Sequence, residues 1–250
     1  MKQIIVMQRS LADENYLKAI FHLSGEEQEP VGTGMLADFL KVRAASVTDK
    51  MKRLQKKGWL DYQKSKGAML TEAGEKIALL IIRKHRLWEQ FLVEVLGFDW
   101  HEVHDIAEQL EHIHSEELID RIDQYLGHPK EDPHGDPIPD AEGKISQQDL
   151  YNLDQVAPGA SYQIITVESR DAELLQFLDK KGLNLHTTLT LIQRETYDRS
   201  IIIEIQETVP INLSRMVAKK IWVSPAKQET GSKTAPKATP KTAPNTPLLF

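Results

Sequence analysis

TGMLADFLKVRAASVTDKMKRLQKKG, residues 33–58, is the stretch that determines how the first part of this chain folds. Apolar residues recur at helical spacing after Thr33, which predicts a short helix. A tight connection from Lys41 to Ala45 leads to a second helix, which begins at Ser46. Gly58 ends that helix, because glycine readily adopts the left-handed conformation that follows a helix. The stretch therefore predicts a helix-turn-helix.

The flanking segments extend this motif to a winged form. A helix opens at Ser10, which is followed by an acidic residue at the third position, and ends near Gly25. After Gly58, residues 59–62 and 68–71 predict two short strands joined by a turn. The order helix, helix, turn, helix, hairpin is typical of a winged helix-turn-helix.

The second helix of the motif is expected to read DNA, since its first residues enter the major groove. Small side chains there allow close approach, hydroxyl groups can bond to bases or phosphates, and basic side chains can contact the DNA backbone. The predicted DNA-binding residues are Arg43, Ala45, Ser46, Thr48, Asp49, Lys50, Lys52, Arg53, and at the hairpin tip Lys64 and Lys66. The alternative is a solvated helix on a module that contacts another protein.

Charge is segregated along the 250 residues, although the net charge is only −6. Residues 41–66 contain nine Lys or Arg and two Asp, whereas residues 98–124 contain nine Asp or Glu and one Arg. Seven of the nine histidines lie between His85 and His134. The first segment suits a polyanion and the second suits cations. Two solvated helix faces of opposite sign are the alternative.

The composition excludes several classes of protein. The absence of cysteine excludes disulfides, thiolate metal sites, iron–sulfur clusters and cysteine nucleophiles. No window approaches the roughly 20 apolar residues that a transmembrane helix needs. The N-terminus has no apolar stretch of the length found in secretory signals. We therefore expect a cytoplasmic protein without a membrane partner.

The histidine-rich segment predicts a metal site on two helices. Thr71 caps a long helix to about Val95, and a second helix covers roughly residues 100–114. Four side chains of the second helix fall on one stripe: His104, Glu108, Glu111 and His112. The long helix carries a pair at i and i+4: His85 and Glu89. Imidazole and carboxylate ligands suit Mn, Fe(II), Co or Zn, and the carboxylate share favours the harder ions. A merely solvated face is the alternative.

The last hundred residues predict a linker, a small domain and a tail. Residues 128–148 are rich in Pro, Gly and Asp and indicate a linker, ordered or mobile. Strand patterns at 162–167, 188–192 and 201–205, with a helix at 172–181, predict a β-rich domain, which we interpret as a five-stranded SH3-like barrel. The composition of residues 226–250 predicts a disordered tail.

Several motifs give the chain a family resemblance over about residues 10–224. They are ENYL at 14–17, KHRLWE at 84–89, HDIAEQLEH at 104–112 and PHGDPIP at 133–139. With them, the chain resembles the iron- and manganese-dependent repressors typified by the diphtheria toxin repressor and the manganese transport regulators. The resemblance implies a mainly α protein with α+β parts.

Pattern and resemblance together predict a domain organisation. We expect a winged helix-turn-helix at 1–74, a helical metal-binding and dimerisation domain at 75–140, a linker at 141–149, an SH3-like (FeoA-like) β-barrel domain at 150–225 and a disordered tail at 226–250.

The resemblance also implies ligand sets and a function. One metal site is Asn15, Glu108, Glu111 and His112, and the other is His85, Glu89 and His104. The implied protein is a homodimeric repressor without catalytic residues, activated by Mn(II) or else Fe(II). It would bind a palindromic operator in double-stranded DNA and control genes of metal-ion homeostasis. A winged-helix regulator that senses an organic ligand and a metallohydrolase are the two alternatives.

Three positions depart from the family pattern. Asn15 stands where the family has Met or Asp, so it can bind a metal only through its amide oxygen. Lys18 stands where two-domain manganese regulators have a Glu, which favours two separate sites over a closely spaced pair. Glu108 replaces the cysteine of iron-responsive members, and an oxygen donor there resembles the manganese branch.

Overall fold

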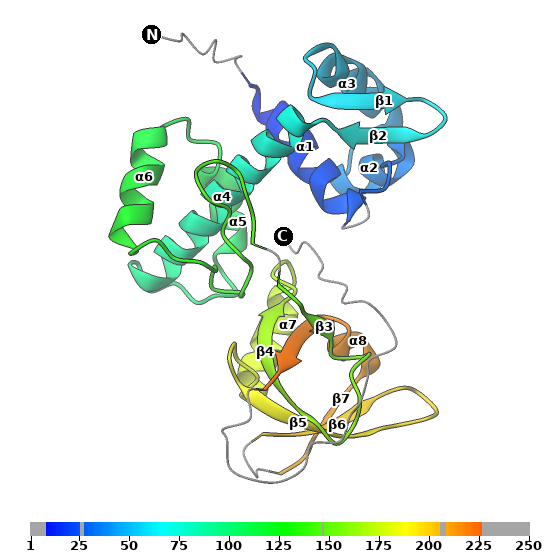
Figure 1. Ribbon diagram of the computed structural model, residues 1–250, viewed down its shortest axis with the longest axis vertical. Coiled ribbons are helices and arrows are strands. Elements are labelled where there is room, and N and C mark those ends of the chain that lie inside the picture. Colours follow the sequence, from blue (N-terminus) through cyan, green and yellow to red (C-terminus); the bar gives the residue numbers. More distant parts are fainter. Residues whose placement is uncertain (1–8, 26–27, 147, 206–208, 227–250) are drawn as a thin grey trace. The chain divides into compact units, whose positions relative to one another are not determined.

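The computed structural model describes residues 9–25, 28–146, 148–205 and 209–226, which form two compact units (Figure 1). The first unit comprises residues 9–98, 105–132 and 137–146, and the second comprises 99–104, 133–136 and 148–226. Of the predicted tail, residues 227–250 lie outside the described part of the chain. No helix among the described residues is long and apolar enough to cross a membrane.

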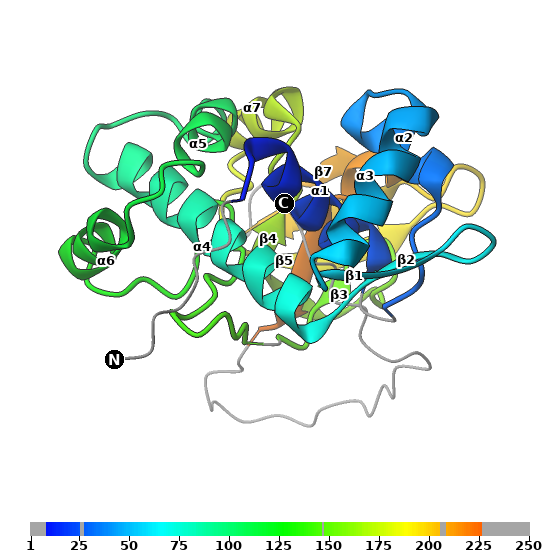
Figure 2. The same ribbon diagram turned by 90° about the horizontal axis from the view of Figure 1, so that it is seen from above.

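The first unit begins with a winged helix-turn-helix and continues into three further helices. Its elements are α1 (Leu11–Ser24), α2 (Thr33–Leu40), α3 (Ala44–Lys56), β1 (Leu60–Gln63), β2 (Gly67–Leu70), α4 (Glu72–Glu94), α5 (His104–Leu110) and α6 (Glu116–Tyr125). In Figure 2, α4 runs from the β1–β2 hairpin towards α5 and α6. This long helix therefore connects the winged motif to the acidic segment.

Local sequence signals account for the winged motif. Ser10 and Asp13 form a capping box that starts α1, and Lys41 ends α2 in the left-handed conformation, with φ 54°. β1 and β2 pair antiparallel, and Val31 bridges to Ala68, the second residue of β2 after the hairpin turn. A Cβ at Gly67 would lie 2.7 Å from the Val31 carbonyl oxygen, so this close approach requires glycine.

Helix α4 has buried side chains on both halves of its length. Its first half packs on α1 through apolar residues that include Ile81 and Ile82. Its second half joins a separate apolar cluster whose buried members are Leu87, Trp88, Ala107, Ile119, Ile122 and Ile138. Burial of such side chains is worth about 1.5–3 kcal/mol each. Both halves of α4 are therefore packed against other helices, and this packing fixes the positions of the polar residues that α4 carries.

Helix α5 is shorter than the predicted helix at residues 100–114. Asp99 and Glu102 form a turn, in which the Glu102 amide donates to the Asp99 carbonyl at 2.9 Å, so helical structure begins only at His104. At the other end, Ser115 is the N-cap of α6 and has extended backbone, with φ −132° and ψ 98°. The chain must leave the helical conformation before that cap, and Glu111 and His112 therefore lie in a turn.

Part of the predicted linker is packed against α4. The guanidinium of Arg86 donates to the Pro137 carbonyl at 2.5 Å, and that of Arg83 donates to the Pro139 carbonyl at 2.8 Å. Residues 137–146 accordingly belong to the first compact unit. A proline-rich composition predicts the lack of regular structure there, but it gives no indication of these two arginine contacts.

The second unit is built on one antiparallel sheet. Its elements are β3 (Tyr151–Asn152), β4 (Ser161–Val167), α7 (Ala172–Lys181), β5 (Thr188–Arg194), β6 (Ile201–Ile205), β7 (Ile211–Leu213), α8 (Arg215–Ala218) and β8 (Ile221–Pro225). The strand order is β3-β8-β4-β5-β6-β7, and its core includes Ile164, Leu175, Leu191 and Ile203. The prediction of five strands was wrong, because the described residues form a sheet of six strands. Pairing of β3 with β7 is absent from the described residues, so closure into a barrel stays a prediction.

The PHGDPIP motif contributes four residues, 133–136, to this second unit. His134 is buried and stacks on Trp100 with ring centroids 5.9 Å apart, and its Nε2 lies 2.8 Å from the Trp100 carbonyl oxygen. Thr166 donates to the Asp136 carboxylate at 2.8 Å. Gly135 has φ 87°, and a Cβ there would lie 1.8 Å from the Ile165 carbonyl oxygen. The glycine is therefore required where this loop crosses β4.

Candidate metal centre

A cluster of acidic and histidine side chains lies between α1, α4 and the end of α5. Its centre is Glu111, whose side chain is fully buried. The Nδ1 atom of His85 is 2.6 Å from Glu111 Oε2, and the Nε2 atom of His85 is 3.0 Å from Glu89 Oε1. One ligand atom from each of His85, Glu108 and Glu111 lies within 4.8 Å of the other two.

The contact between His85 and Glu111 joins residues that the resemblance assigns to different sites. His85 belongs to one implied ligand set, and Glu111 belongs to the other. Both side chains are almost completely buried, and they share a hydrogen bond of 2.6 Å. In the first unit, the two implied ligand sets are therefore in direct contact through this hydrogen bond.

His112 lies beside the same cluster, in the turn after α5. Its Nε2 atom is 3.7 Å from Glu111 Oε1, and its Nδ1 atom is 2.8 Å from Glu14 Oε2. A histidine held by a carboxylate at one ring nitrogen presents the other nitrogen in a defined direction. Here the second nitrogen is directed towards Glu111.

Asn15 contributes an oxygen from α1. Its Oδ1 atom is buried and has no hydrogen-bond partner among the described residues. Burial of an unpartnered amide oxygen is costly, which makes such an atom a natural ligand for a cation. Asn15 follows Glu14, which is hydrogen-bonded to His112. Together with the carboxylates and imidazoles of the cluster, the donor set would be the mixed oxygen and nitrogen type that Mn(II) and Fe(II) accept. The residues of this cluster fit a divalent metal ion.

His104 is the first residue of α5 and belongs to the second unit. Its participation with His85 and Glu89 therefore stays a prediction.

The charge of the cluster is carried partly by His85. Burial alone would lower the pKa of His85, but the negative charge of Glu89 and the hydrogen bonds that the ring donates to Glu111 and Glu89 raise it to about 9. At pH 7 this ring is accordingly protonated. A metal ion that binds His85 must displace that proton, so metal binding is coupled to proton release.

Two residues of the cluster have no assigned role in the sequence-based ligand sets. Lys18 places its Nζ atom 2.5 Å from Glu108 Oε1 and 2.8 Å from each carboxylate oxygen of Glu111. Glu14, the first residue of the ENYL motif, is fully buried beside His112. In the sequence, an acid in the first turn of a helix looks like an ordinary partner of the helix dipole. Only the long-range contact with His112 indicates another role for Glu14.

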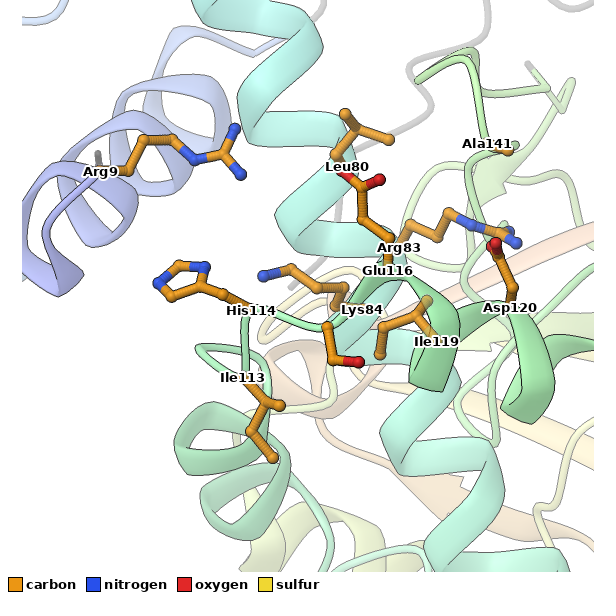
Figure 3. A pocket seen from close by; sticks show the side chains of 11 residues that line it. Arg9, Leu80, Arg83, Lys84, Ile113, His114, Glu116, Ile119, Asp120 and Ala141 are labelled. Atoms are coloured by element: carbon orange, nitrogen blue, oxygen red, sulfur yellow. The ribbon is translucent and has the colours of Figure 1, made fainter. Parts of the chain in front are cut away.

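A cavity of about 750 Å³ lies next to the cluster (Figure 3). Arg9, Lys84 and His114 line one side of it. The Nε atom of Arg9 lies 3.4 Å from Glu14 Oε1, and Nδ1 of His114 lies 3.7 Å from the same oxygen. Glu14 therefore has basic side chains on the cavity side and His112 on the cluster side.

The predicted DNA-binding residues lie on α3, its N-cap and the hairpin. Eight of the ten are exposed: Arg43, Ala45, Ser46, Asp49, Lys52, Arg53, Lys64 and Lys66. Thr48 is half-buried and donates to the Ala44 carbonyl at 3.2 Å. Lys50 is turned towards α1, where its Nζ atom is 2.7 Å from the Asp13 carboxylate. The opposite face of α3 is buried through Val47, Met51 and Leu54.

Three family models match the chain. The N-terminal DNA-binding domain of iron-dependent repressors matches residues 10–68, and the metal-binding and dimerisation domain of the same family matches residues 71–140. A FeoA domain matches residues 151–225.

Two curated relatives illustrate the similarity. The diphtheria toxin repressor of Corynebacterium glutamicum is 32% identical over 192 residues, which are 73% of this chain and 84% of the relative. The iron-dependent repressor IdeR of Mycobacterium tuberculosis is 36% identical over 126 residues, which are 50% of this chain. That match spans 54%, about half, of the mycobacterial protein.

Solved structures resemble the chain over most of its length. A manganese-dependent transcriptional repressor in complex with manganese has a TM-score of 0.79 and 34% identity, and the match covers 86% of this chain and all of the other. ScaR with bound Cd²⁺ has a TM-score of 0.74 and 30% identity, with coverage of 86% and 99%.

Proposed function

This chain belongs to the diphtheria toxin repressor family of iron-dependent repressors, and from that premise we propose that it is a Mn(II)-activated, homodimeric repressor that binds palindromic operator DNA. Its targets would be genes of metal-ion homeostasis. The observation that carries the proposal is the cluster in which α1, part of the winged motif, meets Glu108, Glu111 and His112. A ligand bound there can act on the orientation of the DNA-reading helices.

The choice of manganese rests on the donor atoms. Glu108 would supply a carboxylate and Asn15 a neutral oxygen, and a thiolate ligand is excluded because the chain has no cysteine. Manganese prefers oxygen donors, whereas softer ions gain more from sulfur or additional nitrogen ligands. Fe(II) is the second candidate, since it accepts the same mixture of imidazole and carboxylate.

Each group of the centre would have a separate task. Asn15, Glu108, Glu111 and His112 would hold the metal, and His85, Glu89 and His104 would form the second ligand set. The bound metal would supply positive charge between the carboxylates. Glu14 would orient His112 through its hydrogen bond of 2.8 Å.

DNA binding is supported by the exposed face of α3. The exposed Arg43, Lys52 and Arg53 lie opposite the buried face of that helix, and Lys64 and Lys66 stand in the turn of the hairpin. Basic side chains at such positions contact phosphates, while Ala45 and Ser46 at the start of the helix can approach base edges.

Dimerisation is supported by exposed apolar residues in the first unit. Val95, Leu96 and Phe98 follow the end of α4, and Tyr125 ends α6 with 71% of its surface exposed. Tyr125 contacts Phe91 of α4, with ring centroids 6.3 Å apart. Exposed apolar surface of this kind near the end of α4 would suit a protein interface. They fall within the residues that match the metal-binding and dimerisation domain model.

The metallohydrolase alternative is not supported, because the family consists of repressors rather than enzymes. The experiment that tests the proposal is fluorescence anisotropy with genomic DNA fragments, in the presence of Mn, Fe(II), Co or Zn and with the bound metal counted by elemental analysis. We expect tight binding only with metal, and loss of that response in Glu111→Ala. Equal DNA affinity with and without metal would contradict the proposal and favour a regulator that senses an organic ligand.

A further inference from the structure

We propose that the Lys18 ammonium group is the built-in counter-ion of the metal centre, and that the activating metal binds by displacing it from Glu108 and Glu111. This inference rests on the proposed function, because it concerns the step by which metal would enter the same centre.

The contacts of Lys18 are those of a cation in a binding site. Its Nζ atom lies 2.5 Å from Glu108 Oε1 and 2.8 Å from both oxygens of Glu111. An ammonium group has three protons to donate, and three carboxylate oxygens lie within hydrogen-bond distance. The Lys18 side chain is only 6% exposed and that of Glu111 is fully buried, so water contributes little. Charge-assisted bonds of this kind are strong in a buried site.

The ammonium group and the metal would need the same oxygens. Glu108 and Glu111 are two of the four proposed ligands, and both are hydrogen-bonded to Lys18. Two cations held by one pair of carboxylates would lie almost in contact, where their repulsion in a buried environment is large. Occupancy by Lys18 and occupancy by the metal are therefore mutually exclusive.

Displacement of Lys18 would replace one contact between α1 and the end of α5 by another. Asn15 and Lys18 are three residues apart on α1, so their side chains lie on the same side of the helix. In the structure, α1 is joined to the end of α5 through Lys18. With metal, the buried and unpartnered Oδ1 of Asn15 would take over that connection. The displacement thus gives metal binding a direct effect on the helix that precedes the DNA-reading motif.

A different reading is that Lys18 is a purely structural ion pair. In that case its removal would destabilise the protein without increasing the affinity for metal. The two readings therefore predict opposite outcomes for metal affinity, although both predict a less stable metal-free protein.

The test measures Mn²⁺ binding to the full chain by calorimetry at pH 7. Lys18→Met keeps the length of the side chain but removes its charge, and we expect its dissociation constant for Mn²⁺ to fall about tenfold or more. Lys18→Arg retains the charge and should bind Mn²⁺ nearly as the parent does. Lys57→Met is the matched control. Lys57 forms an ion pair of 2.8 Å with Asp13, which lies on α1 as Lys18 does but is not one of the proposed ligands. Its dissociation constant should not change.

Thermal unfolding of the same samples provides the second readout. Lys18→Met should lower the melting temperature of the metal-free protein, and Mn²⁺ should raise it by more than it does in the parent. A folded Lys18→Met variant that binds Mn²⁺ as weakly as the parent, or more weakly, would overturn the proposal.

A measurement on the unmodified chain keeps the proposal testable if the variants fail to fold. ¹⁵N NMR of the lysine ammonium groups should show a Lys18 signal protected from exchange, and the diamagnetic ion Cd²⁺ should abolish that protection. A signal that stays protected after Cd²⁺ binds would overturn the proposal. DNA binding is measured separately, so loss of metal-dependent operator binding would contradict the proposed function without altering these results.

Discussion

Glu14 Oε2 and His112 Nδ1 lie 2.8 Å apart, and this hydrogen bond links the first turn of α1 to the turn that follows α5. The Glu14 side chain is fully buried, and that of His112 is 11% exposed. A buried carboxylate in this position fixes both the tautomer and the orientation of the imidazole ring. The ring nitrogen left for a metal is the one directed towards Glu111.

We expect Glu14→Gln to weaken metal binding while the fold is retained. The amide can still hydrogen-bond to His112 but lacks the charge that makes the ring a better ligand, so the Mn²⁺ dissociation constant should rise about 10- to 100-fold. Calorimetry checks this, with Glu117→Gln as the control, since Glu117 is exposed on α6 and contacts only Arg121 in the described ion pairs. Unchanged affinity in Glu14→Gln would mean that His112 is oriented without Glu14.

Asn15→Asp should strengthen Mn²⁺ binding. The amide oxygen of Asn15 is buried beside the cluster, and a carboxylate in its place adds a negative charge that a divalent cation favours. The measurement is the Mn²⁺ dissociation constant, together with the metal concentration needed for half-maximal operator binding. If both values stay at those of the parent, Asn15 does not coordinate the metal.

Glu108→Cys should change the order in which metals activate the protein. A thiolate favours softer and later ions, so Zn and Co should gain relative to Mn. The check is a titration of operator affinity with Mn, Fe(II), Co and Zn for the parent and the variant. An identical ranking in both proteins would show that position 108 does not set selectivity.

Replacement of both Lys64 and Lys66 by Ala should weaken DNA binding equally for all sequences. Each phosphate contact that is lost should reduce the slope of log affinity against log salt by about one unit. Anisotropy at several salt concentrations measures this, and Lys180→Ala, an exposed lysine of α7, is the control. A loss of affinity confined to one operator sequence would argue instead for base contacts by the hairpin.

Asp13→Asn should destabilise the metal-free protein in a manner that depends on pH. Burial alone would raise the pKa of Asp13, but hydrogen bonds from Lys50, Lys57 and Ser10 hold it well below its ordinary value of 3.8. The ionised form therefore contributes stability above pH 4, and this contribution is lost as the pH falls below that value.

Urea unfolding should show a cost of about 1–3 kcal/mol for Asp13→Asn at pH 7, and a smaller difference from the parent at pH 3 to 4. Asp38→Asn, at an exposed position of α2, is the control. A difference that does not change with pH would mean that the charge of Asp13 is not the source of its effect.

Helices with strong end signals could be predicted well from the sequence. α7 has the predicted bounds, because Gly182 ends it in the left-handed conformation. The ends of α5 could not be predicted, since they depend on the turn at Asp99 and on the cap at Ser115, which compete with a continuous helical pattern. β3 and β7, with two and three residues, are too short to produce an alternating pattern.

The residues of the candidate site could be predicted from the sequence, but the contacts between them could not. Helical periodicity groups Glu108, Glu111 and His112, although Glu111 and His112 lie in the turn after α5. Asn15 is indicated by the family resemblance alone. The contacts of Glu111 with His85 and Lys18 join residues 26 and 93 positions apart, and neither is implied by local periodicity. Long-range packing between α1, α4 and α5 decides them.

The position of Lys18 has a consequence for how the protein would measure metal. A competitor that is part of the same chain cannot be diluted or depleted, so its effective concentration at Glu108 and Glu111 is constant. The metal concentration at which the protein responds would then depend on a competitor whose local concentration stays constant. Evolution could adjust that set point through the length and charge of one side chain, without altering any metal ligand.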